Sequence, residues 1–236
     1  MAAVKKALFL YKDNFNYILL IGMTIVFPIL LGYTFVVNYA IMPFEFFGIP
    51  LWPQLLHSFF MLIALFMLHP PFVSMVVQDH RFGEVKLGGL YTDTLQYMFP
   101  IYILGILYAF TVTLGMVFFI IPGVALLLMF LAVPQTALID DLVWWQGIKQ
   151  SCKFGLKRFF PLLGIFLMFA VIDTLLSSLI LFVAMLITKY FIFSNLVIMI
   201  VNALSLPFFI FTVGYMYWEW KEERSENESG FRIRHE

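Results

Sequence analysis

The chain consists of long, continuous runs of apolar residues separated by short polar stretches. A helix needs about 20 apolar residues to cross the hydrocarbon layer of a bilayer, and several runs reach or approach that length. Because the runs are continuous rather than alternating, they predict membrane-spanning helices and not barrel strands. The expected spans are residues 17–41, 55–77, 100–121, 123–139, 162–187 and 195–218. The predicted fold class is therefore all-α, a polytopic transmembrane bundle of six spans with cytoplasmic amphipathic interfacial helices.

The spans predict a single membrane domain over residues 1–218. Residues 219–236 are polar and short, so we expect a disordered cytoplasmic tail. Ile121-Pro122-Gly123 predicts a tight turn that makes a close antiparallel hairpin of the third and fourth spans. Prolines inside spans are expected to kink them or to end a regular segment. These prolines are Pro28, Pro70, Pro71, Pro134 and Pro207.

Composition supports a membrane protein and excludes most other classes. The chain is 63% hydrophobic and 12% charged, whereas soluble domains carry about 25% charged residues. The formal net charge is zero, so no nucleic-acid partner is expected. Cys152 is the single cysteine, which excludes an internal disulfide and a multi-cysteine metal site.

The basic residues predict the orientation of the chain. Of the 14 lysines and arginines, all except Lys189 fall before the first span, after the sixth, or in alternate connections between spans. Basic residues accumulate on the cytoplasmic side of membrane proteins. We therefore expect a multi-pass protein of the cytoplasmic membrane with both termini in the cytoplasm.

Residues 140–160 have the periodicity of an amphipathic helix in the membrane plane. Asp140 and Asp141 stand at its expected start, where a capping side chain and negative charge are favoured. The main role is expected to be bracing of the neighbouring spans, with contact to anionic lipid headgroups as the alternative. The predicted apolar face contains Trp145, Ile148, Cys152, Leu156 and Phe159. The residues expected at the lipid interface are Trp144, Trp145, Lys149, Lys153 and Lys157.

This region also carries a resemblance to a known family. Ile121-Pro122-Gly123 is followed by a span, by Ala137-Leu138-Ile139-Asp140, by a helix with Trp145, Ile148-Lys149 and Ser151, and by Phe160. These features resemble an uncharacterised bacterial integral-membrane family that includes the six-span domain fused to some glycerophosphodiester phosphodiesterases. The resemblance implies a six-helix membrane fold and no established activity. The chain ends soon after the last span, so we expect no fused catalytic domain.

Three polar residues inside the spans are candidates for an intramembrane polar site. Asp173 falls near the middle of the fifth span, and burying a carboxyl there is expensive. His69 precedes two prolines in the second span, and Gln135 follows Pro134 in the fourth. The site would bind a cation or relay a proton. The alternative for each residue is a hydrogen bond between packed helices.

No catalytic, phosphate-binding, dinucleotide or metal-binding motif is present in the sequence, so neither an enzyme nor a cofactor is expected. The function favoured by the sequence is a non-enzymatic scaffold or envelope-assembly component, with lipids and other membrane proteins as partners. The alternative is a small-molecule or lipid transporter that uses Asp173.

Overall fold

The computed structural model describes residues 2–47, 51–187 and 191–233, and it confirms the all-α prediction, since these ranges contain helices and no strand. Lys189, the one basic residue expected on the outer side, falls outside the described residues. The helices are α1 (Ala2–Asp13), α2 (Phe15–Ile21), η1 (Gly22–Val26), α3 (Phe27–Phe46), α4 (Leu51–Phe82), α5 (Leu87–Phe118), α6 (Ile120–Phe130), α7 (Val133–Asp140), α8 (Trp144–Lys157), α9 (Phe159–Ile187) and α10 (Phe191–Ile233).

The helices provide six segments, among the described residues, that are long and apolar enough to cross a membrane, as predicted. Helices α4 and α5 have 32 residues each, which corresponds to about 48 Å at 1.5 Å per residue. Since the hydrocarbon layer is about 30 Å thick, both helices continue beyond it. The segments are Phe15–Phe44, Leu51–Phe82, Leu87–Phe118, Ile120–Asp140, Phe159–Ala184 and Leu196–Glu226.

The prolines inside the spans act in two ways. The π-helical turn η1 lies just before Pro28, and α6 ends at Phe130 so that α7 begins with Pro134 in its first turn. Proline lacks the N–H that a regular helix uses, so irregular turns at these points are expected. Pro70, Pro71 and Pro207 instead lie within continuous helices. Neighbouring helices stabilise such positions in membrane proteins.

Helices α5 and α6 form the close hairpin that the sequence predicts, but the turn comes earlier than expected. The chain reverses at Phe119, whose backbone is extended, and Pro122 already lies in the first turn of α6. The two helices touch through glycines: a Cβ on Gly115 would lie 3.1 Å from the Cα of Gly123. Small residues allow this close approach of membrane helices.

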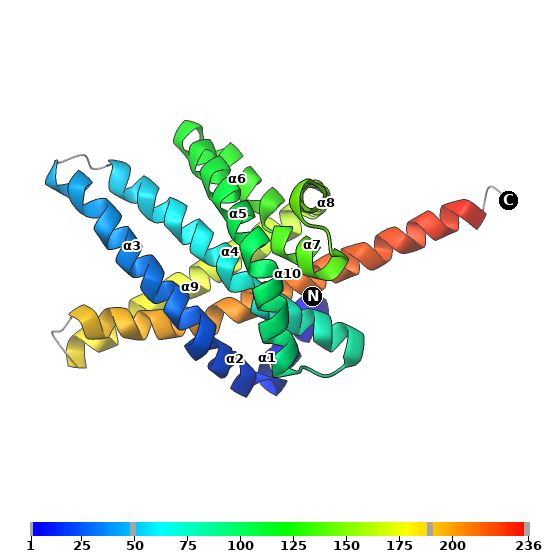
Figure 1. The fold of residues 1–236 in the computed structure, drawn as a ribbon, viewed down its shortest axis with the longest axis horizontal. Helices are drawn as coiled ribbons and strands as arrows, with labels where there is room; N and C mark the ends of the chain where they lie inside the picture. The colour runs from blue at the N-terminus through cyan, green and yellow to red at the C-terminus, as the bar shows by residue number, and fades with distance from the viewer. Residues whose placement is uncertain (1, 48–50, 188–190, 234–236) are drawn as a thin grey trace.

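The hairpins α3–α4, α5–α6 and α9–α10 fan out from a common region, as Figure 1 shows. That region contains α1, α7, α8, residues 66–81 of α4 and residues 209–224 of α10, and we call it the base. Most fully buried side chains lie there, whereas large apolar side chains toward the hairpin tips are exposed. The hairpins are therefore held together mainly at one end.

Basic residues from separate segments gather at the base. Arg81 of α4 and Lys221 of α10 both donate to the carbonyl oxygen of Ile139, at 3.1 and 3.5 Å. Arg224 of α10 donates to Gln150 of α8 at 3.1 Å. The lysine-bearing helix α8 and the end of α4 consequently lie at the same end of the bundle.

Residues 219–233, which the sequence pattern assigns to a tail, continue α10 as a helix to Ile233. Its polar segment is held by ion pairs that hydropathy does not reveal. Glu222 pairs with His80 at 3.1 Å, and Glu223 pairs with Arg158 at the start of α9. Lys221 pairs with Asp140 at the end of α7.

We expect Gly123→Ala to destabilise the bundle by about 1–3 kcal/mol, the usual cost of overpacking a tight contact. The added Cβ would lie 2.8 Å from the backbone nitrogen of Met116, and that backbone cannot move aside as a flexible side chain does. Thermal unfolding of the purified protein in detergent measures the loss.

Gly164→Ala is the matched control, because nothing lies within 4 Å of a Cβ at that helical position. It should leave the unfolding temperature unchanged or slightly raised. Equal unfolding temperatures for the two variants would contradict the close contact between α5 and α6.

Candidate functional site

Asp173 lies on α9, and its half-buried side chain faces α10. Ser205 of α10 donates a hydrogen bond to Asp173 Oδ1 at 3.2 Å. One turn further along α9, Ser177 donates to Asn202 Oδ1 at 3.4 Å. These side chains join the two helices within the predicted membrane layer, as polar residues commonly do between spans.

His69 and Gln135 lie fully buried in α4 and α7. His69 Nδ1 is 2.6 Å from the carbonyl oxygen of Leu65, one turn earlier in the same helix. His69 Nε2 and both amide atoms of Gln135 have no hydrogen-bond partner among the described residues. Buried polar atoms are normally paired, so these atoms stand out among the buried groups of the described residues.

Asp173 lies apart from the other two candidates, whereas His69 and Gln135 lie on helices that pack against each other. Helix α9 packs mainly on α10, with smaller contacts to α6 and α8, whereas α7 packs on α4, α5 and α8. Within the described ranges, no hydrogen bond joins Asp173 to His69 or to Gln135. The single cation or proton site that would need all three is therefore not assembled by direct contacts.

The polar residues that the structure does bring together lie at the base. Tyr217 of α10 donates a hydrogen bond to Asp140 at the end of α7, and Lys221 forms an ion pair with the same carboxylate. Tyr215 of α10 donates to Asp79 near the end of α4. Two tyrosines of one helix thus bind carboxylates of two other helices, and hydrogen bonds to charged groups are among the stronger ones.

A second polar set joins α4 to α5. Ser74 donates to the carboxylate of Asp93, and Gln78 Nε2 donates to Ser74 Oγ at 3.2 Å. Gln78 Oε1 accepts the backbone N–H of Lys86 at 2.8 Å, which closes the connection between the two helices. The chain reversal at residues 83–86 is therefore held by a buried side chain of the preceding helix.

Helix α8 begins at Trp144, and the prediction that Asp140 and Asp141 cap it is wrong. Asp140 ends α7, while Asp141 adopts a left-handed backbone with φ 56°. The N-cap residue is Val143, which makes no side-chain cap bond. Asp140 instead binds α10, and Asp141 accepts a hydrogen bond from Tyr97 at 2.6 Å. Both carboxylates that the sequence pattern assigned to capping α8 therefore bind side chains of other helices.

One side of α8 braces the bundle. Ile148 and Phe154 are buried, Ser151 donates to the carbonyl oxygen of Met129 at 2.7 Å, and a Cβ on Gly155 would lie 2.6 Å from Met129 Cα. The buried side includes Ser151 and Gly155 because close packing on α6 favours small residues. This side is rotated from the predicted apolar face, whose members Trp145 and Leu156 are exposed.

The predicted interfacial residues all lie on the exposed part of α8. Trp144 and Trp145 are 51% and 65% exposed, and Lys149, Lys153 and Lys157 are exposed as well. The Lys149 ammonium lies 5.7 Å from the centroid of the Trp145 ring. Exposed tryptophans beside lysines are typical of a helix at a membrane surface.

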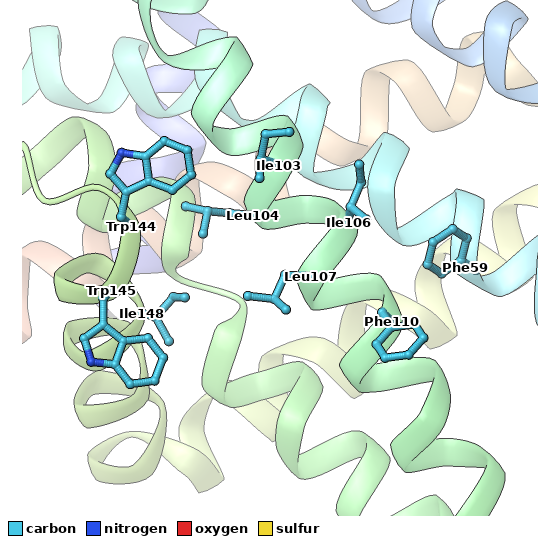
Figure 2. A pocket seen from close by; sticks show the side chains of 9 residues that line it. All are labelled: Phe59, Ile103, Leu104, Ile106, Leu107, Phe110, Trp144, Trp145 and Ile148. Carbon is cyan, nitrogen blue, oxygen red and sulfur yellow. The ribbon is translucent and has the colours of Figure 1, made fainter.

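An apolar groove of about 630 Å³ lies beside these tryptophans. In Figure 2 its floor is formed by α5 side chains between Ile103 and Phe110, with Phe59 of α4 on one side and Trp144, Trp145 and Ile148 of α8 on the other. A second cavity, of about 500 Å³, is polar and lies at the junction of α1 and α2 beside the end of α4, where Asp13, Asp79 and Glu84 line it. Asp173 lines neither of these two cavities.

The chemistry of these sites favours packing and apolar binding. Among the described residues, no group of three or more histidine, cysteine or acidic side chains could hold a metal ion. Burial raises the pKa of the Cys152 thiol, and a raised pKa reduces the thiolate fraction that a nucleophile needs.

Tyr11 connects α1 to α10, because its hydroxyl donates a hydrogen bond to the carbonyl oxygen of Leu204 at 3.0 Å. Burial raises the pKa of this hydroxyl.

Comparisons with protein-family models, with curated proteins and with solved structures give no match for this chain. The fold by itself defines the class, which is an all-α, multi-pass membrane protein.

Sequence reasoning missed Tyr215 and Tyr217, because tyrosines near the end of a span usually indicate interfacial anchoring. A signal was available in the two aspartates that they bind. Asp79 and Asp140 stand at the ends of apolar segments, and a carboxylate that becomes buried there needs a donor. Which donor it finds depends on the packing of α10, which the sequence pattern does not encode.

We expect Asp140→Ala to destabilise the protein by about 1–3 kcal/mol, because it leaves the Tyr217 hydroxyl and the Lys221 ammonium without their shared acceptor. The Asp140 side chain is 8% exposed, so water replaces it poorly. Thermal or denaturant unfolding in detergent measures the change.

Glu223→Ala is the control, since it removes an ion pair to Arg158 whose partners are 50% and 29% exposed. Exposed pairs contribute about 0–1 kcal/mol. The role of Asp140 in joining α7 to α10 is refuted if both variants lose the same stability.

Proposed function

We propose that this chain is a non-enzymatic scaffold or envelope-assembly component of the cytoplasmic membrane, with its N- and C-termini in the cytoplasm. The orientation is supported by the basic residues at the base, since such residues accumulate on the cytoplasmic side. We propose no nucleic-acid partner, because the net charge of the chain is zero.

The observation that carries the scaffold proposal is the exposure of α9. In its most apolar stretch no residue is buried within the chain, whereas 67% of the corresponding stretch of α4 is buried. On the uncovered side this span nevertheless carries the exposed polar residues Thr174 and Ser178. Polar side chains facing hydrocarbon are costly, so a helix of another membrane protein is a favourable cover for this face.

Lipid is the other proposed partner. The lysines and tryptophans of α8 project outward at the base, and each basic residue near an anionic membrane surface contributes roughly 1 kcal/mol of binding. We also propose membership of the bacterial six-span family on the features from Ile121 to Phe160 described above. Membership would add no activity, because the resemblance implies none.

A second candidate is transport of a small molecule or lipid along α9. The specific support is the pair of hydrogen bonds from Ser205 to Asp173 and from Ser177 to Asn202, which places four polar side chains at the α9–α10 contact. A permeating cation or proton would bind these side chains in place of the hydrogen bonds between them. The two candidates differ in what α9 contacts and in whether a small ligand stabilises the protein.

We expect a membrane-impermeant maleimide to label Ile121→Cys and not Lys153→Cys in intact cells, with Cys152→Ser as the background of both variants. Ile121 is 84% exposed near the tip of the α5–α6 hairpin, and Lys153 is exposed on α8 at the base. Permeabilised cells should label at both positions. Labelling of Lys153→Cys alone in intact cells would reverse the proposed orientation.

We expect a photo-crosslinking amino acid at Leu179 of α9 to give a discrete protein–protein adduct in native membranes. Leu114 of α5 is the matched control, because it is also an exposed leucine within a span, and it should give lipid adducts only. The scaffold proposal fails if Leu179 also gives lipid adducts only.

The transport candidate requires instead that a small molecule raises the unfolding temperature of the purified protein and that Asp173→Asn abolishes the rise. Thr174→Val is the control, since the Thr174 hydroxyl donates to Ala170 within its own helix. A rise that survives Asp173→Asn would exclude Asp173 from the binding of that molecule.

A further inference from the structure

The apolar groove beside α8 has the position and the lining of a lipid site. Its floor between Ile103 and Phe110 lies within the α5 span, and its other walls come from α4 and α8. The seven residue steps from Ile103 to Phe110 extend about 10 Å along the helix axis, so the groove runs along a membrane-spanning segment. An occupant must therefore be apolar over that length.

The tryptophan end of the groove differs from the rest. Trp144 and Trp145 bring their indole rings to the groove from the side that α8 forms, as Figure 2 shows. Indole rings favour the boundary between acyl chains and headgroups. The groove thus begins at the expected headgroup level and continues toward the hydrocarbon, which is the course of one acyl chain of a membrane lipid.

The charges around this end favour a negative headgroup. Helix α8 carries three lysines and no acidic residue. Lys149 lies against the Trp145 ring, and Lys153 follows one turn later on the same exposed side. In the described chain no ion pair joins these lysines to an acidic side chain. The nearby carboxylates are already bound, Asp140 by Tyr217 and Lys221 and Asp141 by Tyr97.

We propose that this groove binds one acyl chain of an anionic phospholipid from the surrounding bilayer, with Lys149 and Lys153 holding the headgroup. The apolar floor selects the chain, the tryptophans set its depth, and the two ammonium groups select the charge. This site adds a ligand to the protein and does not depend on the scaffold role of α9.

The test is native mass spectrometry of the full chain, released from vesicles that contain phosphatidylglycerol and phosphatidylcholine in equal amounts. The wild-type protein should retain one phosphatidylglycerol in preference to phosphatidylcholine. Leu107→Trp should remove the retained lipid, because the larger side chain fills the floor of the groove. Leu114→Trp, on the same helix and outside the groove lining, should retain it.

Charge variants test the headgroup separately, so the proposal stays testable if Leu107→Trp does not fold. Lys149→Gln with Lys153→Gln should lower the preference for phosphatidylglycerol by roughly fivefold for each lysine. Lys5→Gln with Lys6→Gln removes the same charge from α1, which also carries exposed lysines, and should leave the preference unchanged.

Three results would overturn the proposal. Equal lipid retention by Leu107→Trp and Leu114→Trp would mean that the lipid is not in the groove. An equal loss of preference in the two lysine pairs would mean that only general surface charge attracts the lipid. A dimer mass that Leu107→Trp alone abolishes would place a second copy of the chain in the groove.

Discussion

The carboxylate of Asp140 is a buried polar contact that joins parts of the bundle far apart in the chain. It binds Tyr217 and Lys221, and so it joins the end of α7 to the buried part of α10. In lipid the hydrophobic effect does not draw helices together, because acyl chains are as apolar as leucine. Hairpins that diverge from one end therefore need specific polar contacts and close packing at that end. The tyrosine, aspartate and lysine contacts of the base supply the polar part.

This constraint explains why so much apolar surface remains exposed. Because contacts concentrate at the base, the hairpins present long unpaired faces toward their tips (Figure 1). The α9 face and the groove between α4, α5 and α8 are two consequences of the same geometry. One offers polar side chains within an exposed span, and the other offers an apolar groove lined in part by Trp144 and Trp145. Both suit a protein that acts through its membrane contacts.

Local sequence patterns do not predict which partner a polar side chain binds when several are possible. Asp140 and Asp141 have the right position to cap α8, yet their carboxylates instead accept hydrogen bonds from Tyr217, Lys221 and Tyr97. Asp173, His69 and Gln135 all lie within spans, yet the sequence does not state which faces meet. The polar tail from residue 219 has the composition of disorder, but ion pairs to α4, α7 and α9 hold its first turns as helix.

The sequence by itself determined the helical class, the six apolar segments, the close α5–α6 hairpin and the grouping of basic residues at one end. These features follow from the continuity of apolar runs, from glycine and proline, and from the distribution of charge, all of which act locally. Only the tertiary structure decided that Tyr215 and Tyr217 bind aspartates, that α9 stays uncovered, and that a groove opens beside Trp144. Those outcomes depend on the rotation and crossing of helices far apart in the chain, which periodicity within one helix does not specify.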